Sequence, residues 1–250
     1  MDAILYICHG SRVQFAVHSA ISFVKKVQKQ IDCLIQEISF IELATPSIYE
    51  GLHNCVQQGA TSITVLPVLL LSANHAKIDI PEEIAAFQKR FPKVRITIGH
   101  PIGVHQNMIE LVKKRIQKKT IIVHPDAKIL LVGRGSSDQL TQNDFLSIAT
   151  LLESKLNRTV IPAYMAVTKP SFQEAYTLLL SEKNCPIIVV PYLFFSGTLM
   201  KEMTEKISRL PPSLQQNWIL CETLGYDHLI ASIFQERLIE TKSVHPFIHA

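Results

Sequence analysis

Hydrophobic residues form short continuous runs along this chain, and amphipathic stretches separate them. Residues 63–71 are apolar almost throughout, which is typical of a strand buried on both faces and is too short to span a membrane. The run ends abruptly in the polar residues 72–75. Ligands of open α/β sheets collect at the carboxyl ends of strands, so His75 is the first candidate functional residue.

Strand-like runs and helical patterns alternate through the first half of the chain. Ser47 is a suitable N-cap for the second helix, and Pro81 lies in the first turn of the third. The expected strands are residues 3–8, 37–43, 63–71 and 94–99, and the expected helices are residues 14–30, 48–57, 80–90 and 106–117. Four strand–helix units are therefore predicted, and their strands must be parallel.

The same pattern begins again after a polar, linker-like stretch at residues 117–126. Landmarks recur in the same order at offsets of 122 to 125 residues: Gly10-Ser11 as Gly135-Ser136, Pro46-Ser47 as Pro170-Ser171, Pro67 and Ser72 as Pro191 and Ser196, and Gly103 as Gly225. Such a repeat indicates duplication. We predict an α/β fold of two similar domains, residues 1–120 and 121–250, each a parallel sheet flanked by helices and facing the other across a cleft.

Composition narrows the class of protein. Hydrophobic residues are 47% and charged residues 18% of the chain, which is typical of a globular protein. The formal charge of +4 and the aromatic content of 7% do not favour nucleic-acid binding, but an anionic small substrate is compatible. The five cysteines are widely spaced and form no C-x-x-C pair, so neither disulfides nor a structural zinc site is expected.

No run approaches the ~20 apolar residues that a membrane helix needs. The opening run, residues 3–8, is also too short for the core of a signal peptide. We therefore predict a cytoplasmic protein without membrane association. The sequence does not distinguish a monomer from a homodimer.

Three potential metal ligands follow the first three predicted strands: His9, Glu42 and His75. Adjacent parallel strands lie ~4.8 Å apart, so these side chains can meet at one edge of the sheet. Two imidazoles and one carboxylate suit a divalent first-row metal ion and leave positions open for a substrate. Taken singly, a histidine after a strand is more often a turn or capping residue, and a glutamate there is usually solvated.

The repeat offers an internal contrast, because the counterparts of these three residues are Arg134, Ala166 and Leu199. These side chains cannot hold a metal ion. The second half is therefore expected to carry a degenerate site, whereas the first half keeps ligand-type residues.

Other combinations of residues give weaker evidence of a functional site. Cys8 next to His9 suggests a thiol nucleophile, but neighbouring strand residues point to opposite faces, which argues against the pair. Residues 133–137 are similar to a phosphate-binding loop but lack the full glycine pattern. His100 and His105 flank a predicted turn and could approach the cleft.

At these positions the sequence resembles the small sirohydrochlorin chelatases of the class II chelatase group, specifically the two-domain sirohydrochlorin ferrochelatases of siroheme synthesis. The resemblance rests on the strand and H-G-S-R motif at residues 4–12, the second strand at 37–43, and the P-x-L-L-L-x-x-x-H-x-x-x-D-I-P motif within 65–81. Residues 133–138 and 190–199 match as well. It therefore covers nearly the whole chain.

The resemblance implies insertion of ferrous iron into sirohydrochlorin, an anionic tetrapyrrole, with His9, Glu42 and His75 as catalytic residues and metal ligands. The metal ion is then a substrate, and no organic cofactor is expected. Neutral imidazoles, with an ordinary pKa of ~6.5, can bind the ion and accept pyrrole protons. The expected substrate-binding residues lie on the same loops: Ser11, Arg12, Asn74, Lys77, Arg134 and Lys201.

Two alternatives remain open at this point. A cobaltochelatase of cobalamin synthesis would use the same substrate and similar ligands, because iron and cobalt accept similar nitrogen and oxygen donors. A non-catalytic carrier of metal or tetrapyrrole would also need such a site.

Overall fold

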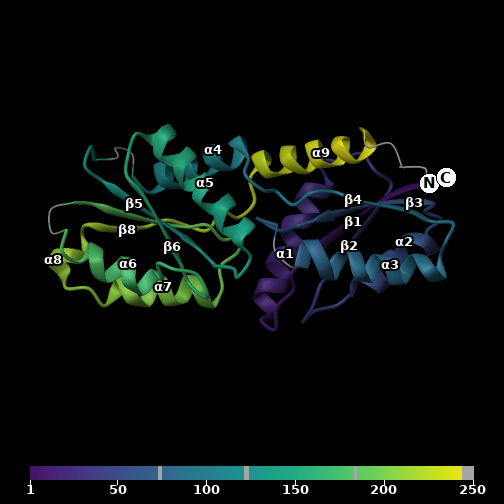
Figure 1. The fold of residues 1–250 in the computed structure, drawn as a ribbon, viewed down its shortest axis with the longest axis horizontal. Coiled ribbons are helices and arrows are strands. Elements are labelled where there is room, and N and C mark those ends of the chain that lie inside the picture. Colours follow the sequence, from purple (N-terminus) through teal and green to yellow (C-terminus); the bar gives the residue numbers. More distant parts are fainter. Residues whose placement is uncertain (73–74, 121–123, 183–184, 244–250) are drawn as a thin grey trace. The chain divides into compact units, whose positions relative to one another are not determined.

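A computed structural model describes residues 1–72, 75–120, 124–182 and 185–243 of the chain (Figure 1). The chain forms two compact units. The first comprises Met1–Gly103 and the C-terminal segment from His228, and the second comprises Val104–Asp227.

Each unit contains a four-stranded parallel sheet. In the first, the order is β2-β1-β3-β4, with β1 Asp2–Cys8, β2 Ile35–Phe40, β3 Ser62–Pro67 and β4 Arg95–Ile98. In the second, the order is β6-β5-β7-β8, with β5 Lys128–Gly133, β6 Val160–Tyr164, β7 Ile187–Pro191 and β8 Trp218–Leu220. The predicted α/β fold with two parallel sheets is confirmed, and the identical strand order agrees with duplication.

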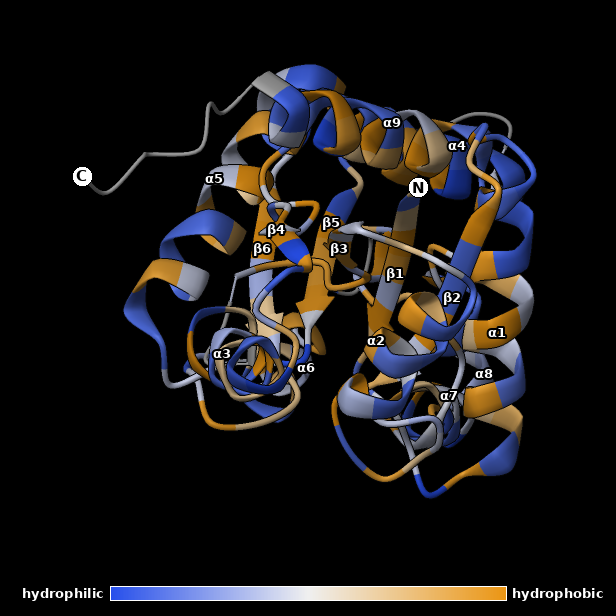
Figure 2. Cartoon of the chain, turned by 90° about the vertical axis from the view of Figure 1, so that its right-hand side faces the viewer, coloured by the Kyte–Doolittle hydropathy of each residue, from blue (hydrophilic) through white to orange (hydrophobic). Residues whose placement is uncertain are grey.

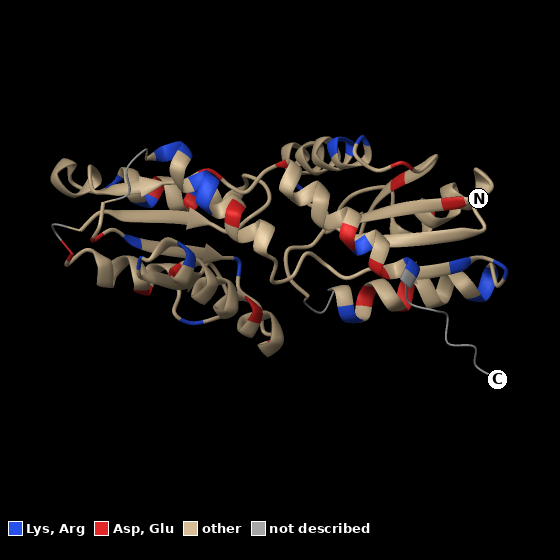
Figure 3. Cartoon of the chain, turned by 90° about the horizontal axis from the view of Figure 1, so that it is seen from above, with Lys and Arg blue, Asp and Glu red and all other residues tan. Residues whose placement is uncertain are grey.

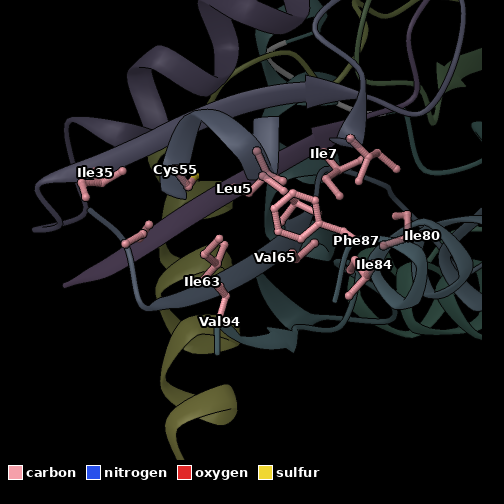
Figure 4. Packing of buried hydrophobic residues seen from close by; sticks show 14 residues of the cluster. Leu5, Ile7, Ile35, Cys55, Ile63, Val65, Ile80, Ile84, Phe87 and Val94 are labelled. Atoms are coloured by element: carbon pink, nitrogen blue, oxygen red, sulfur yellow. The ribbon is translucent and has the colours of Figure 1, made fainter. Parts of the chain in front are cut away.

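Helices cover both faces of the first sheet. Helices α2 (Ile48–Gln57) and α3 (Ile80–Arg90) pack on one face, and a π-helix, η1 (His75–Asp79), leads into α3. Their side chains meet Leu5, Val65 and Phe87 in one buried cluster (Figure 4). Helices α1 (Gln14–Gln28) and α9 (His228–Ser243) contact each other on the opposite face. There Phe234 of α9 packs edge-on against Tyr6 of β1.

The second sheet is covered in the same way. Helices α6 (Phe172–Leu179) and α7 (Thr198–Ser208) enclose a cluster that includes Tyr176 and Trp218, whereas α4 (Gln106–Lys119) and α5 (Gln139–Leu156) contact each other. A short helix, α8 (Pro212–Gln215), precedes β8. Strands are mostly hydrophobic in Figure 2, whereas the helices show both colours, as expected when each helix buries one face.

The compact units do not coincide with the predicted domains, residues 1–120 and 121–250. The last helix of each sequence repeat packs in the unit of the other repeat, because α4 contacts α5 and β7, and α9 contacts α1 and β3. An arginine anchors each exchanged helix. Arg115 of α4 donates to the carbonyl of Leu224, and Arg237 of α9 donates to the carbonyl of Ile102.

Two strands end earlier than their hydrophobic runs predict. Strand β3 ends at Pro67 rather than Leu71. The amide of Val68 still donates to Ile7 of β1, whereas the carbonyl of Leu70 accepts from the amide of Gly103. Strand β2 ends at Phe40 rather than Leu43. The apolar side chains beyond these strand ends either pack in loops or are exposed. Hydrophobic periodicity alone does not distinguish such residues from residues of a buried strand.

Both sheets carry the same turn after their second strand. Ser47 caps α2 and exchanges hydrogen bonds with Glu50, and Ser171 caps α6 and exchanges them with Glu174. The predicted N-cap at Ser47 is confirmed. Acidic and basic residues are interspersed along the helices in Figure 3. Within the described residues, no helix is both long and apolar enough to cross a membrane.

Candidate metal centre

The ladder between β1 and β2 continues beyond the strands and places His9 next to Glu42. The amide of Ile41 donates to the carbonyl of Cys8 at 2.9 Å, and the amide of Glu42 donates to that of His9 at 3.2 Å. The His9 Nδ1 and Glu42 Oε1 atoms are 3.8 Å apart, and their side chains are 28% and 45% exposed. The predicted proximity of His9 and Glu42 is therefore confirmed, and both reach solvent.

This spacing is close to what one ion requires. Two donors that each lie 2.0–2.2 Å from a metal ion are about 3.0–3.5 Å apart in tetrahedral or octahedral geometry. A side-chain shift of less than ~1 Å would bring His9 Nδ1 and Glu42 Oε1 to that separation. His9 Nδ1 also lies 3.3 Å from the carbonyl of Gly10. In the other tautomer, in which Nδ1 carries the proton, Nδ1 would donate to that carbonyl or to Glu42, and Nε2 instead of Nδ1 would be the metal donor.

Gly10 makes the close approach of the two loops possible. Its φ is +95°, and a Cβ atom at this position would lie 1.8 Å from the carbonyl oxygen of Glu42. No side chain fits that distance, so the residue after His9 must be glycine for Glu42 to sit beside it.

His75 is the first residue of the π-helix η1, beyond the carboxyl end of β3. Single π-helical turns are rare and are frequent at functional sites. The side chain of His75 lies outside the described part of the structure, so its position relative to His9 and Glu42 stays a prediction. Among the described side chains, which do not include that of His75, no three His, Cys, Asp or Glu residues are grouped to hold a metal ion.

The predicted substrate-binding residues lie on the same loops. Ser11 accepts a hydrogen bond from the amide of Val13 at 3.1 Å, and Arg12 is exposed. Lys77 is an exposed residue of η1. Asn74 lies outside the described residues. These positions are compatible with contact to an anionic substrate, and their roles stay predictions.

In the second unit, Arg134 and Lys201 are exposed residues at the positions that correspond to His9 and Lys77. Arg134 follows β5, and Lys201 lies in α7, where its amine is 3.7 Å from Glu205. The amide of Ala166 donates to the carbonyl of Arg134, as Glu42 does to His9. The backbone of the candidate site is thus repeated, whereas Arg134 and Ala166 offer no metal donors.

Two alternative assignments lose support. Cys8 is only 2% exposed, and burial raises the pKa of its thiol to about 12, so it does not form the thiolate that a nucleophile requires. His105 accepts a hydrogen bond from the amide of Asn107 at 3.1 Å and is the N-cap of α4. This capping role accounts for His105 without a bound ligand. One feature near the site could not be predicted from the sequence: Leu43, directly after Glu42, has a left-handed backbone conformation.

A family model described as CbiX matches residues 3–119 and 128–241, which correspond to the two repeats. The chain belongs to the CbiX family. Among CbiX-related proteins it is 41% identical to a sirohydrochlorin ferrochelatase of Priestia megaterium over 239 residues, covering 95% of this chain and 90% of that protein. It is 29% identical to a sirohydrochlorin cobaltochelatase of the same organism over 246 residues, covering 96% of this chain and 80% of that one.

A solved structure, SirB from Bacillus subtilis with Fe³⁺, has the same architecture. Its TM-score is 0.88 at 38% sequence identity, covering 97% of this chain and 96% of that one. The similarity therefore extends over both units of this CbiX-family chain.

Proposed function

We propose that this chain is a sirohydrochlorin ferrochelatase, a metal chelatase that inserts ferrous iron into sirohydrochlorin in siroheme synthesis. The observation that carries the proposal is the pair His9 and Glu42, 3.8 Å apart and open to solvent at the carboxyl edge of the first sheet. The 41% identity to a protein of that activity supports it. The proposal makes the metal ion a substrate that passes through the site.

His9, Glu42 and His75 would hold the incoming ion. Three protein ligands leave coordination positions for ring nitrogens, so the ion can transfer without first becoming free. Mixed imidazole and carboxylate donors bind ferrous iron less tightly than thiolates bind soft metals, which favours release to the macrocycle. The partly exposed His9 and Glu42 side chains are accessible to a bound ring.

Metal insertion also displaces two protons from the pyrrole nitrogens of the ring, since one divalent ion replaces two N–H hydrogens. A neutral imidazole or the Glu42 carboxylate can accept a proton as the ion leaves it. Because both side chains reach solvent, the protons can then pass to water. The reaction is balanced without any redox step.

Basic side chains would pair with the carboxylates of the substrate. In the first unit, Arg12 and Lys77 are exposed near His9 and His75 in the sequence. In the second unit, Arg134 follows β5 and Lys201 lies in α7, and both are exposed. Guanidinium groups can bind carboxylates through two parallel hydrogen bonds. The Lys201 amine, 78% exposed and 3.7 Å from Glu205, can reorient toward a ligand at small cost.

Cobalt insertion into the same substrate is the second candidate function. The donors at the site suit cobalt as well as iron, and the chain is also related to a cobaltochelatase. The lower identity to that protein, 29% against 41%, favours iron.

The test is anaerobic turnover by the purified chain with sirohydrochlorin and either Fe²⁺ or Co²⁺, followed by the change in the absorption spectrum of the ring. A ferrochelatase should give multiple turnovers and a higher kcat/KM with Fe²⁺. A higher kcat/KM with Co²⁺ would support the second candidate. Binding of ring or metal without turnover would indicate a carrier and contradict both.

A further inference from the structure

An exposed apolar residue in a strained conformation follows Glu42. Leu43 has a φ of +60°, and it is 48% exposed. The left-handed region favours glycine, asparagine and aspartate, because other side chains crowd the following carbonyl. An exposed leucine also gains little from burial. The turn between β2 and α2 requires the backbone conformation of Leu43, but it does not require an apolar side chain there.

The same combination recurs in the second unit. Val167, after Ala166, has a φ of +62° and is 76% exposed. A branched residue is even less suited to this region of backbone conformation. Because Arg134 and Ala166 replace the candidate ligands there, the apolar residue persists without the metal donors. Its purpose is therefore separate from holding the ion.

Further exposed apolar side chains lie on the loop of His9. Val13 is 45% and Phe15 is 67% exposed, at the start of α1. Both residues lie shortly after Cys8, the carboxyl end of β1, in the chain. The hydrogen bond from Glu42 to His9 holds this loop beside that of Leu43. We call Val13, Phe15 and Leu43 the apolar rim.

The apolar rim needs an occupant with an apolar surface, and a hydrated metal ion has none. The substrate of the proposed function is a broad ring with an apolar face and carboxylates at its periphery. We propose that the apolar rim, and Leu43 above all, binds the face of the macrocycle next to His9 and Glu42. This inference rests on the proposed function, and it assigns ring binding and metal binding to different side chains of the first unit.

The test compares two leucines at opposite ends of β2. Leu34, 88% exposed, precedes the strand, and Leu43 follows it at the edge of the candidate site. The affinity of the full chain for metal-free sirohydrochlorin is measured by fluorescence titration. Leu43→Asn should raise the Kd at least about fivefold, the effect of losing a partly buried leucine contact, whereas Leu34→Asn should change it less than about twofold.

Two controls separate the apolar contact from folding and metal binding. Asparagine tolerates the left-handed region, so the Tm of Leu43→Asn should not fall. Its affinity for Co²⁺ without the ring should match that of the unsubstituted chain. Leu43→Met keeps an apolar side chain of similar size and should keep the ring affinity.

The outcomes distinguish this inference from the proposed function. An unsubstituted chain that does not bind sirohydrochlorin would contradict the proposed function, and the inference with it. Normal binding by the unsubstituted chain and by Leu43→Asn would overturn the inference alone. Equal losses in Leu34→Asn and Leu43→Asn, a loss in Leu43→Met equal to that in Leu43→Asn, or a parallel loss of Co²⁺ affinity would also overturn it.

Discussion

The two units place different side chains on the same backbone. In each, the carbonyl of the residue after the first strand accepts a hydrogen bond from the amide two residues beyond the end of the second strand. A glycine with a φ of +95° lets the loops meet, and a serine caps the next helix. His9 and Glu42 occupy the first unit, whereas Arg134 and Ala166 occupy the second. Loop geometry is therefore a property of the scaffold, and the candidate chemistry depends on two or three side chains.

The largest expected effect comes from removing a candidate ligand. His9→Ala should lower the rate of iron insertion at least about a hundredfold, because one of the three proposed metal donors is lost. Anaerobic insertion assays and circular dichroism measure activity and folding. The matched variant is Arg134→Ala, which should retain metal binding. Activity of His9→Ala close to that of the unsubstituted chain would contradict the site.

The glycines test the shared scaffold. A Cβ would lie 1.8 Å from the carbonyl oxygen of Glu42 at Gly10 and 1.9 Å from that of Ala166 at Gly135. We expect Gly10→Ala and Gly135→Ala each to lower the free energy of unfolding by roughly 2–4 kcal/mol, measured by denaturant titration.

Gly197→Ala is the control for this pair, because an added Cβ there would have no neighbour within 4 Å. Its effect should stay within about 1 kcal/mol, the cost of alanine at the N-cap position of α7. If Gly10→Ala were as stable as Gly197→Ala, the close approach between Gly10 and the carbonyl of Glu42 would be contradicted.

A smaller effect distinguishes the capping glutamates of the two units. Lys169, 2.5 Å from Glu174, and the Ser171 amide and hydroxyl lower the pKa of Glu174 to about 2. The Ser47 amide and hydroxyl lower that of Glu50, which has Thr45 in place of the lysine. Lys169→Ala should therefore raise the pKa of Glu174 toward that of Glu50, as followed by NMR titration.

The sign of the associated pH dependence follows from the lowered pKa. The contribution of Glu174 to stability is present above its unfolded value of ~4.3 and is lost as the pH falls toward 2. Lys169→Ala should narrow this acid window. An unchanged titration of Glu174 in that variant would show that Ser171 alone sets its pKa.

The smallest expected effect is that one substitution adds no metal binding to the second unit. Arg134→His restores one imidazole to the second unit, but Ala166 and Leu199 supply no further donors. Calorimetry with Co²⁺ should show the same stoichiometry for this variant as for the unsubstituted chain. A second bound ion per chain would show that fewer ligands suffice than the comparison implies.

The sequence by itself determined the parts that depend on local pattern. Continuous apolar runs identify β1 and β3, and the N-cap Ser47 and first-turn Pro81 mark the starts of α2 and α3, which span the predicted residues. The spacing of repeated landmarks shows the duplication. Because adjacent parallel strands end at one edge, these patterns also predicted that His9 and Glu42 would lie together.

The tertiary structure alone decided the exchange of α4 and α9 between the two repeats. Both helices bury apolar side chains, and the sheet on which each packs depends on long-range contacts. These include Phe234 against Tyr6 and the bonds of Arg115 and Arg237 to distant turns. The left-handed conformation of Leu43 also has no local signal, since leucine is poorly suited to it. Contacts between segments far apart in the chain impose both features, and a hydrophobic pattern records only what each segment buries.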